Sequence, residues 1–442
     1  DEPAGPREDP PARANENPTV KTRSDADRTA ALHPHRRRLA IISFLLGFLC
    51  FAGLLTVAYL LAPVIQGSGI APPRTPVPIA ELAKRQQDTI REQAAGKTTH
   101  TRNFVTRMHA RQQQDPDATM DFLILSGGGA NGAFGAGFLI GWATVPAGPA
   151  ALPTFDGVTG VSTGSFIAPF AYLGTDRARR EVDDFFRNPR PDWVTSREPI
   201  SFYPENMSLM EVSGIRRDLE AIVDLDFAKR IDAATTEGRL LLIQASNIDE
   251  QIPGVFDFAD AARKSIEAGD TERLHEIILA SCAIPAVFPP REIDGNLYVD
   301  GGAIGNFYAG GRASAAKDTF GGQWKRTYPD APIPKTRYWV ILNGNLRIPP
   351  AISQPTWPAV ADRAFQLLYT SAEITALRRL FDLAELTRLR GDGDVEVRWI
   401  SVEQELASPD PMNMFDAKTM RSLSDHGRML GADPTSWKTV AP

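Results

Sequence analysis

Ser162 stands between Gly160 and Gly164 in a Gly-x-Ser-x-Gly pentapeptide, where its hydroxyl could act as a nucleophile. A short strand signal at residues 155–159 precedes the pentapeptide, and an apolar stretch typical of a helix, residues 165–173, follows it. A sharp turn between a strand and a helix exposes a serine hydroxyl, and glycines on both sides prevent collisions in that turn. The pattern predicts a nucleophile elbow, with a chance glycine-rich turn as the alternative.

A glycine-rich loop lies some thirty residues earlier, between the apolar run 121–125 and a helical pattern that continues to Trp142. The loop consists of Ser126, Gly127, Gly128, Gly129, Ala130, Asn131 and Gly132. Glycine permits positive φ, so successive backbone N–H groups can converge on an anion at a helix N-terminus. The anion could be a dinucleotide pyrophosphate, a nucleotide phosphate or the oxyanion of an acyl-transfer reaction. The Gly-Lys-Ser/Thr ending of a phosphate loop is missing, but the loop alone does not decide among the three.

A serine hydroxyl needs a base within hydrogen-bond reach, usually a histidine held by a carboxylate. Only two histidines, His275 and His426, follow the elbow. Asp300 ends a short β-like run at residues 297–299, a position from which a loop can present a carboxylate to the serine of a neighbouring strand. Asp300 is therefore the favoured base. His426 is the main rival, because it would complete a serine, aspartate, histidine order like that of α/β-hydrolases.

The order of these motifs resembles the patatin-like phospholipases, which use a Ser-Asp dyad without histidine. The motifs are the glycine-rich loop, the Gly-x-Ser-x-Gly pentapeptide and Asp300-Gly301-Gly302. Residues 280–290, ASCAIPAVFPP, also resemble the Ala-Ser-x-x-x-Pro-x-x-Phe-Pro-Pro block of that family, and Asn306 matches an asparagine often found after Asp-Gly-Gly. The resemblance covers residues 121–310 and extends to about residue 430.

The resemblance implies a role for each matched residue. Ser162 would attack the acyl carbonyl, Asp300 would accept its proton, and the N–H groups of Gly128, Gly129 and Ala130 would form the oxyanion hole. Asn131 departs from the family pattern, because many members have Arg or Lys at this position. An amide brings no positive charge, so the departure bears on substrate choice.

The implied reaction is hydrolysis of a phospholipid, a lysophospholipid or a related lipid ester through an acyl-enzyme, with no metal and no other cofactor. Two alternatives remain open. One is a soluble short-chain ester or thioester hydrolase, and the other is a non-catalytic lipid-binding module of the same fold.

The elements that position these residues belong to one predicted catalytic domain, residues 116–432, followed by a tail at 433–442. A chain of 442 residues with 43% hydrophobic residues can bury one large α/β core. We expect a three-layer α/β domain with a mostly parallel central sheet and helices on both faces. An amphipathic helical pattern over residues 362–389 is interpreted as ordinary core.

The segments before this domain predict a membrane anchor. Residues 1–38 indicate a disordered cytoplasmic tail, and the uncharged apolar residues 39–62 predict a transmembrane helix. Residues 63–115 predict a Pro-rich tether and a polar helical linker. Three arginines at 36–38 favour a cytoplasmic N-terminus, which would place the catalytic domain on the periplasmic side of a bacterial inner membrane. A cleaved signal peptide is the alternative.

Composition limits the remaining possibilities. The formal net charge of −6 gives no bulk attraction to nucleic acid. Only two cysteines occur, Cys50 and Cys282, so neither a disulfide framework nor a cysteine metal cluster is expected. Cys282 lies in an apolar block, which favours a small buried residue over a reactive thiol. The bilayer and a lipid ester are the expected partners, and no protein partner is indicated.

Overall fold

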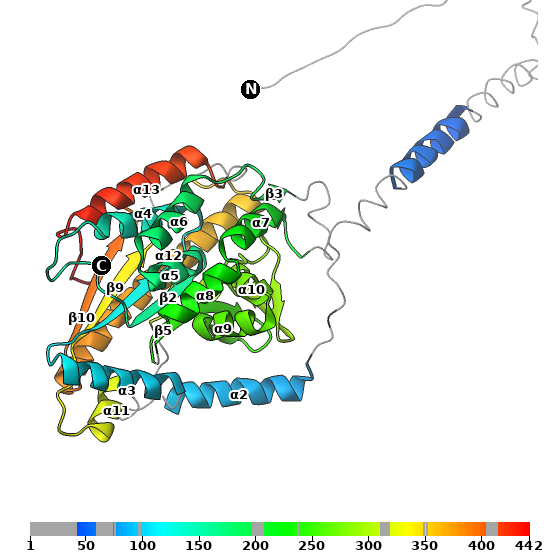
Figure 1. Ribbon diagram of the computed structural model, residues 1–442. Coiled ribbons are helices and arrows are strands. Elements are labelled where there is room, and N and C mark those ends of the chain that lie inside the picture. Colours follow the sequence, from blue (N-terminus) through cyan, green and yellow to red (C-terminus); the bar gives the residue numbers. More distant parts are fainter. Residues whose placement is uncertain are drawn as a thin grey trace, which may run out of the picture. The chain divides into compact units, whose positions relative to one another are not determined.

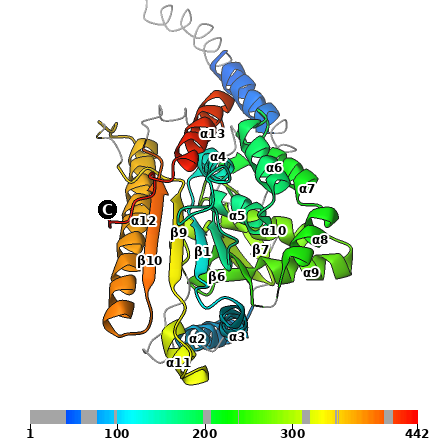
Figure 2. The same ribbon diagram turned by 60° about the vertical axis from the view of Figure 1, so that its left-hand side comes forward.

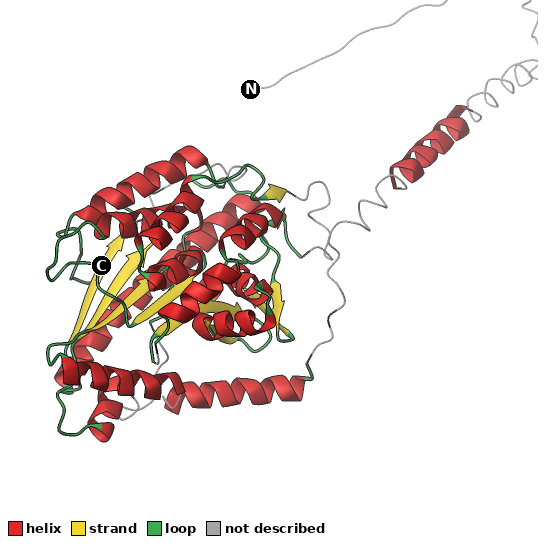
Figure 3. Cartoon of the chain, in the orientation of Figure 1, coloured by secondary structure: helices red, strands yellow, loops and turns green. Residues whose placement is uncertain are grey.

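The computed structural model describes residues 42–58, 74, 77–95, 99–196, 207–236, 238–309, 319–347, 350, 352–403 and 414–442. The chain divides into two compact units, Asp1–Ser68 and Gly69–Pro442. Helices and strands alternate through most of the second unit, which holds all of the predicted site residues (Figures 1 and 3).

An eight-stranded sheet forms the centre of the second unit, in the order β10-β9-β1-β2-β5-β8-β7 with β6 paired to β5. Its strands are β1 (Met120–Leu125), β2 (Gly157–Val161), β5 (Leu240–Asn247), β6 (Ile252–Asp257), β7 (Arg291–Ile293), β8 (Asn296–Val299), β9 (Thr336–Leu342) and β10 (Val395–Ser401). A separate pair consists of β3 (Thr195–Ser196) and β4 (Met210–Glu211). The strands from β10 to β5 run parallel, whereas β6, β7 and β8 pair antiparallel with their neighbours. The predicted mostly parallel sheet is thus confirmed.

The helices cover both faces of this sheet, as predicted. They are α2 (Ile79–Ala95), α3 (Thr99–Gln114), α4 (Gly132–Trp142), α5 (Thr163–Leu173), α6 (Asp176–Arg187), α7 (Ser213–Ile222), α8 (Leu225–Ala234), α9 (Phe258–Ala268), α10 (Glu272–Ser281), α11 (Phe320–Thr327), α12 (Trp357–Leu389) and α13 (Ala417–Ala432), with short 3-10 helices η1 (Gly129–Asn131) and η2 (Gly301–Ala303). Helices α4, α5 and α10 pack with Leu123 and Leu125 of β1 in one core, and α12 packs with Ile124 in another. Because side chains alternate along a strand, the two cores lie on opposite faces (Figure 2).

Helix α3 is fastened to the end of the sheet at which the central strands β1 and β2 begin. Its Phe104, Val105 and Met108 are buried, and its Arg107 and Arg111 both contact the fully buried carboxylate of Asp156. Asp156 also accepts a hydrogen bond from the N–H of Asp121 at 2.9 Å. This carboxylate therefore joins α3 to both central strands.

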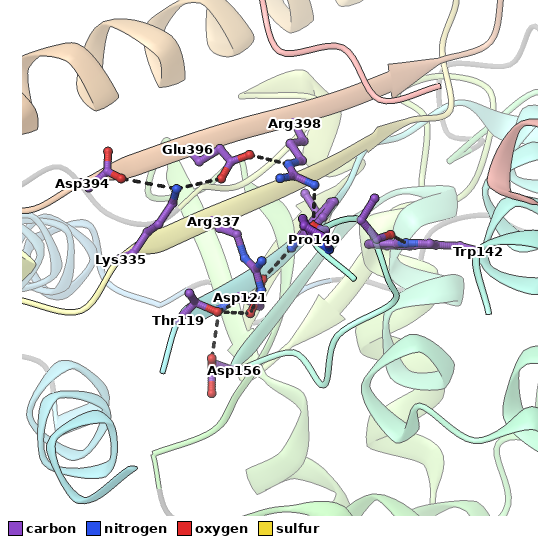
Figure 4. A network of polar contacts seen from close by, with 12 residues as sticks. Thr119, Asp121, Trp142, Pro149, Asp156, Lys335, Arg337, Asp394, Glu396 and Arg398 are labelled. Atoms are coloured by element: carbon purple, nitrogen blue, oxygen red, sulfur yellow. Dashed lines mark hydrogen bonds and ion pairs between the residues drawn. The ribbon is translucent and has the colours of Figure 1, made fainter. Parts of the chain in front are cut away.

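A second polar cluster lies at the same end of the sheet (Figure 4). The carboxylate of Asp121 accepts hydrogen bonds from Arg337 at 2.8 Å, Trp339 Nε1 at 2.7 Å and Thr119 Oγ1 at 2.9 Å. These contacts hold the start of β1 against β9, in the register that pairs Asp121 with Arg337. The amino ends of the parallel strands are thus fixed by charged groups.

A helix over residues 42–58 is described within the stretch for which the sequence predicts a transmembrane helix. Residues 39–41 and 59–62 of that stretch, and the predicted tail at 1–38, lie outside the described residues. Over the part of the chain that is described, a search for a helix with the length and apolar character needed to cross a bilayer found none.

Candidate active site

Ser162 occupies a sharp turn between β2 and α5. Strand β2 ends at Val161 and α5 begins at Thr163, so the predicted strand, turn and helix are all present. The backbone of Ser162 has φ 51° and ψ −126°. A non-glycine residue pays about 1–3 kcal/mol for such a conformation, and strain of this kind is concentrated at functional sites.

Gly160 and Gly164 allow the helix to approach the sheet closely. A Cβ at Gly160 would come closer than 3.0 Å to the carbonyl oxygen of Gly164, and one at Gly164 would come equally close to the carbonyl oxygen of Leu125. Any side chain at either position would push α5 away from β1 and β2. The close approach fixes where the serine lies.

Ser281, at the end of α10, joins the turn at Ser162 to strand β5. Its hydroxyl accepts a hydrogen bond from the N–H of Ser162 at 2.9 Å and donates one to the carbonyl of Gln244 at 2.6 Å. Ser281 belongs to the block at residues 280–290, but sequence analysis gave it no role. The Ala-Ser pair in that block was the available signal.

Asp300 lies directly after β8 and is 2% exposed. One carboxylate oxygen accepts a hydrogen bond from the N–H of Gly302 at 2.7 Å, and the N–H of Asp300 donates to the carbonyl of Ala283 at 2.7 Å. Burial raises the pKa of Asp300 to about 6, although hydrogen bonds from the Ser162 hydroxyl and from Gly302 oppose this rise. The structure therefore brings Ser162 and Asp300 together.

The glycine-rich loop lies against the serine. A Cβ at Gly127 would be 3.0 Å from the Cβ of Ser162, and one at Gly132 would collide with Oγ1 of Thr163. Gly129 has φ +56°, a conformation that favours glycine. The loop thus passes directly beside the elbow and then enters α4.

The amide groups of this loop differ in their partners. The N–H of Gly127 donates to the carbonyl of Asn306 and the N–H of Asn131 donates to that of Gly128, each at 3.1 Å. For the three amides between them, Gly128, Gly129 and Ala130, no hydrogen bond is found among the described residues. Asn131 is half-buried, and its side chain does not cap α4.

An apolar pocket opens beside Ser162. Its walls come from the elbow, α5, α6, α7 and α10 and from the residues just before α13. They include Phe166, Phe185, Trp193, Val212, Ile215, Leu279, Cys282, Phe288, Met414 and Phe415. The thiol of the partly buried Cys282 is hydrogen-bonded to the hydroxyl of Ser165, with 3.6 Å between Sγ and Oγ. Burial, together with the nearby charge of Asp300, raises the pKa of that thiol, so it stays protonated.

Helix α12 supplies two residues whose position the sequence did not reveal. The ring of Tyr369 packs on Gly302, where a Cβ would collide with it. The carboxyl group of Glu373 is buried, and burial raises its pKa to about 7 although Ser126 and Asn306 oppose the rise. An acidic residue four positions after Tyr369 and four before the apolar Leu377 was the available signal, because all three share one helix face.

The histidines whose side chains the structure describes lie elsewhere. His426 lies on α13 with its ring 5.8 Å from that of Phe134, and no described contact joins it to Ser162 or Asp300. His275 is buried on α10, where its Nε2 lies 2.7 Å from the carbonyl of Val223. His109 stacks on Tyr328. His33 and His35 are outside the described residues.

Three possible metal ligands, Glu220, Glu272 and His275, have side-chain atoms within 4.8 Å of one another. Arg216 already forms ion pairs with both of these carboxylates and with Glu276. The cluster is therefore described as an ion-pair network around Arg216.

Comparison with known families gives one match, which covers the motifs described above. The model of the family described as patatin-like phospholipase matches residues 123–311. This range includes the glycine-rich loop, the elbow and Asp300, but not α12. A search of curated proteins found no match to the chain.

Proposed function

Because residues 123–311 form a patatin-like phospholipase domain, we propose that the chain is a serine hydrolase that cleaves the acyl esters of lipids. The observation that carries the proposal is the strained Ser162, which lies beside a buried Asp300 and lines an apolar pocket. A nucleophile, its base and a place for an apolar chain thus meet at one point.

The proposed reaction has two steps. Asp300 takes the proton from the hydroxyl of Ser162 as the oxygen attacks the acyl carbonyl, and the N–H groups of Gly128, Gly129 and Ala130 hold the negative charge that forms. Asp300 then gives this proton to the departing alcohol, leaving an acyl-enzyme. In the second step Asp300 deprotonates a water molecule that attacks the acyl carbon, and it then returns this proton to Oγ of Ser162 as the bond to the acyl group breaks and the free acid leaves. No metal or other cofactor takes part in these steps.

The pocket supports a lipid substrate over a short ester. Its lining is apolar, and each methylene group buried there contributes about 0.8 kcal/mol. A long acyl chain would therefore bind more tightly than an acetyl group. Asn131 brings no charge to the loop, so the proposed recognition rests on the acyl chain more than on a phosphate.

The test is hydrolysis of acyl esters and phospholipid vesicles by the parent and by Ser162→Ala, Asp300→Asn and His426→Ala. We expect the first two variants to lose roughly 10³-fold or more in kcat, because nucleophile and base act as a unit. His426→Ala should stay within about threefold of the parent.

The alternatives give different results. An equal loss in His426→Ala would indicate a Ser-Asp-His triad, whereas a preference for acetyl over long-chain esters would indicate a soluble short-chain esterase. A folded parent that binds vesicles but hydrolyses nothing would indicate a lipid-binding module and contradict the proposal.

We further propose that residues 39–62 anchor the chain in a bilayer, with the N-terminus in the cytoplasm and the catalytic domain on the periplasmic side. The stretch carries no charge, and within its described helix the side chains of Phe44 and Leu49 are 73% and 68% exposed. The full chain should stay with membranes after alkaline carbonate extraction, and a variant lacking residues 1–78 should not. Release of both would contradict an anchor.

A further inference from the structure

Asn343 follows the last residue of β9, beyond the stretch that matches the family, and it is fully buried. Strand β9 pairs in parallel with β1, and their register ends with Leu125 opposite Ile341. Asn343 therefore leaves β9 beside the glycine-rich loop that leaves β1. An amide side chain buried at this point is costly unless it is hydrogen-bonded.

The main chain of Asn343 lies against the start of the glycine-rich loop. Its N–H donates to the hydroxyl of Ser126 at 2.9 Å, and that hydroxyl donates to the carbonyl of Gly127 at 2.8 Å. The carbonyl of Asn343 occupies the place where a Cβ of Gly128 would lie. Only glycine at position 128 lets the loop pass this close to the residue after β9.

The side chain of Asn343 contacts the chain on both sides of the loop amides at 128–130. Nδ2 donates to the carbonyl of Ser126, before these amides, at 2.7 Å. Oδ1 occupies the space where a Cβ of Gly135 would lie, in the first turn of α4 after them. Within the described residues this oxygen has no hydrogen-bond partner, so it serves to fill the space beside the helix.

We propose that Asn343 is a positioning residue, whose side-chain amide holds the glycine-rich loop between Ser126 and α4 and so fixes the loop amides beside Ser162. The loop meets the serine at Gly127, where a Cβ would be 3.0 Å from the Cβ of Ser162. Asn343 is not among the residues that line the pocket, so it acts through the loop and not on the acyl chain. The inference rests on the proposed hydrolysis, in which a displacement of about 1 Å can cost roughly 100-fold in rate.

The test compares the parent with Asn343→Ala, with the double variant Asn343→Ala/Gly135→Ala and with Val397→Ala. Asn343→Ala removes the hydrogen bond to Ser126 and opens a space beside α4. The methyl group of Gly135→Ala refills that space without restoring the bond, so the double variant also serves if Asn343→Ala alone does not fold. Val397 is buried on β10, which does not pair with β1, and controls for a general loss of stability.

Both Asn343 variants should lose rate without losing substrate binding. We expect kcat on a dodecanoyl ester to fall about 10–100-fold, with KM changed less than about threefold, because the pocket is untouched. Val397→Ala should keep kcat within about threefold of the parent.

A second measurement, binding of dodecylboronic acid, separates the position of the loop amides from packing. A boronic acid forms a tetrahedral adduct with a serine hydroxyl, and an oxygen of that adduct takes the place of the oxyanion. Its dissociation constant, measured by calorimetry, should rise in both Asn343 variants by about the factor by which kcat/KM falls. In Val397→Ala it should stay near that of the parent.

The inference is overturned if Asn343→Ala keeps its kcat, if the double variant recovers the activity of the parent, or if the boronic acid binds both Asn343 variants as tightly as the parent. Recovery in the double variant would show that Asn343 only fills space. A parent inactive on every ester would refute the proposed function and this inference together. An active parent whose Asn343 variants behave like Val397→Ala would overturn this inference alone.

Discussion

At the scale of single residues, the base assignment depends on a buried carboxylate that is unusually basic. Burial disfavours the ionised form of Asp300, which raises its pKa to about 6, and the hydrogen bonds from Ser162 and Gly302 keep the rise from being larger. Asp300 is then mostly ionised at pH 7, as a proton acceptor must be. A pKa near the working pH also makes a carboxylate a better general base.

The pH dependence of kcat/KM follows from this pKa. Only ionised Asp300 can accept the proton of Ser162, so kcat/KM should level off above about pH 7 and fall about tenfold per pH unit well below pH 6. Initial rates on a neutral ester between pH 4.5 and 8 measure this. Glu373 has a pKa of about 7, so the profile should be repeated in Glu373→Gln, where the fall near pH 6 should remain. Activity independent of pH over this range would contradict Asp300 as the base.

The tight turn at Ser162 could be predicted from a short motif, because glycines and a serine in this order indicate a sharp bend between a strand and a helix. Gly160 and Gly164 are required by backbone contacts that any side chain would break. Glu373 could not be placed in this way, because a single acid in an amphipathic helix looks like a solvent-exposed residue until its neighbours are known. The polar residues that influence its pKa, Ser126 and Asn306, lie far from it in the sequence.

At the scale of elements, the sheet is held differently at its two ends. Parallel strands place their carboxyl ends together, so the loops after β1, β2 and β9 meet beside Ser162. At the amino ends, Asp121 and Asp156 bind arginines and backbone amides. The sequence indicated the strands through their apolar runs, but it gave no indication of these ion pairs, whose partners are separated by up to 216 residues.

Asp156 should be a large contributor to stability. Its carboxylate is fully buried between Arg107 and Arg111, so Asp156→Asn would leave two arginines without their shared partner. We expect the free energy of unfolding to fall by about 3–5 kcal/mol, the usual cost of breaking a buried ion pair. Urea unfolding measures it, with exposed Asp184→Asn as the control, which should change stability by less than about 0.5 kcal/mol. Equal stability of the two variants would show that the contacts of Asp156 are not needed.

At the scale of the whole molecule, the pocket is built from segments that are distant in sequence. Ser162, Val212, Phe288 and Phe415 come from four different parts of the chain. No local pattern identifies the apolar part of this set, since Val212, Phe288 and Phe415 each look like ordinary core residues in the sequence. The fold class, by contrast, follows from the alternation of strand and helix signals along the chain.

The preference of the enzyme for long acyl chains should depend on the size of this pocket. Val212 is buried in the pocket wall, so Val212→Phe should take up space that a long acyl chain would fill. We expect the ratio of kcat/KM for a dodecanoyl ester to that for an acetyl ester to fall at least about tenfold. Val360→Phe, at an exposed position of α12, is the control and should leave the ratio unchanged. An unchanged ratio in Val212→Phe would place the acyl chain elsewhere.

The separation of the two ends of the sheet has a consequence for how this protein can be altered. Substitutions around Asp121 and Asp156 act at the amino ends of the strands, whereas Ser162 and the glycine-rich loop follow their carboxyl ends. Substitutions at the amino ends could thus change thermal stability, whereas substitutions at the carboxyl ends could change substrate preference. This holds for protein engineering and for evolution alike. Libraries that randomise the two regions separately should combine additively, because the two sets share no contacting side chains.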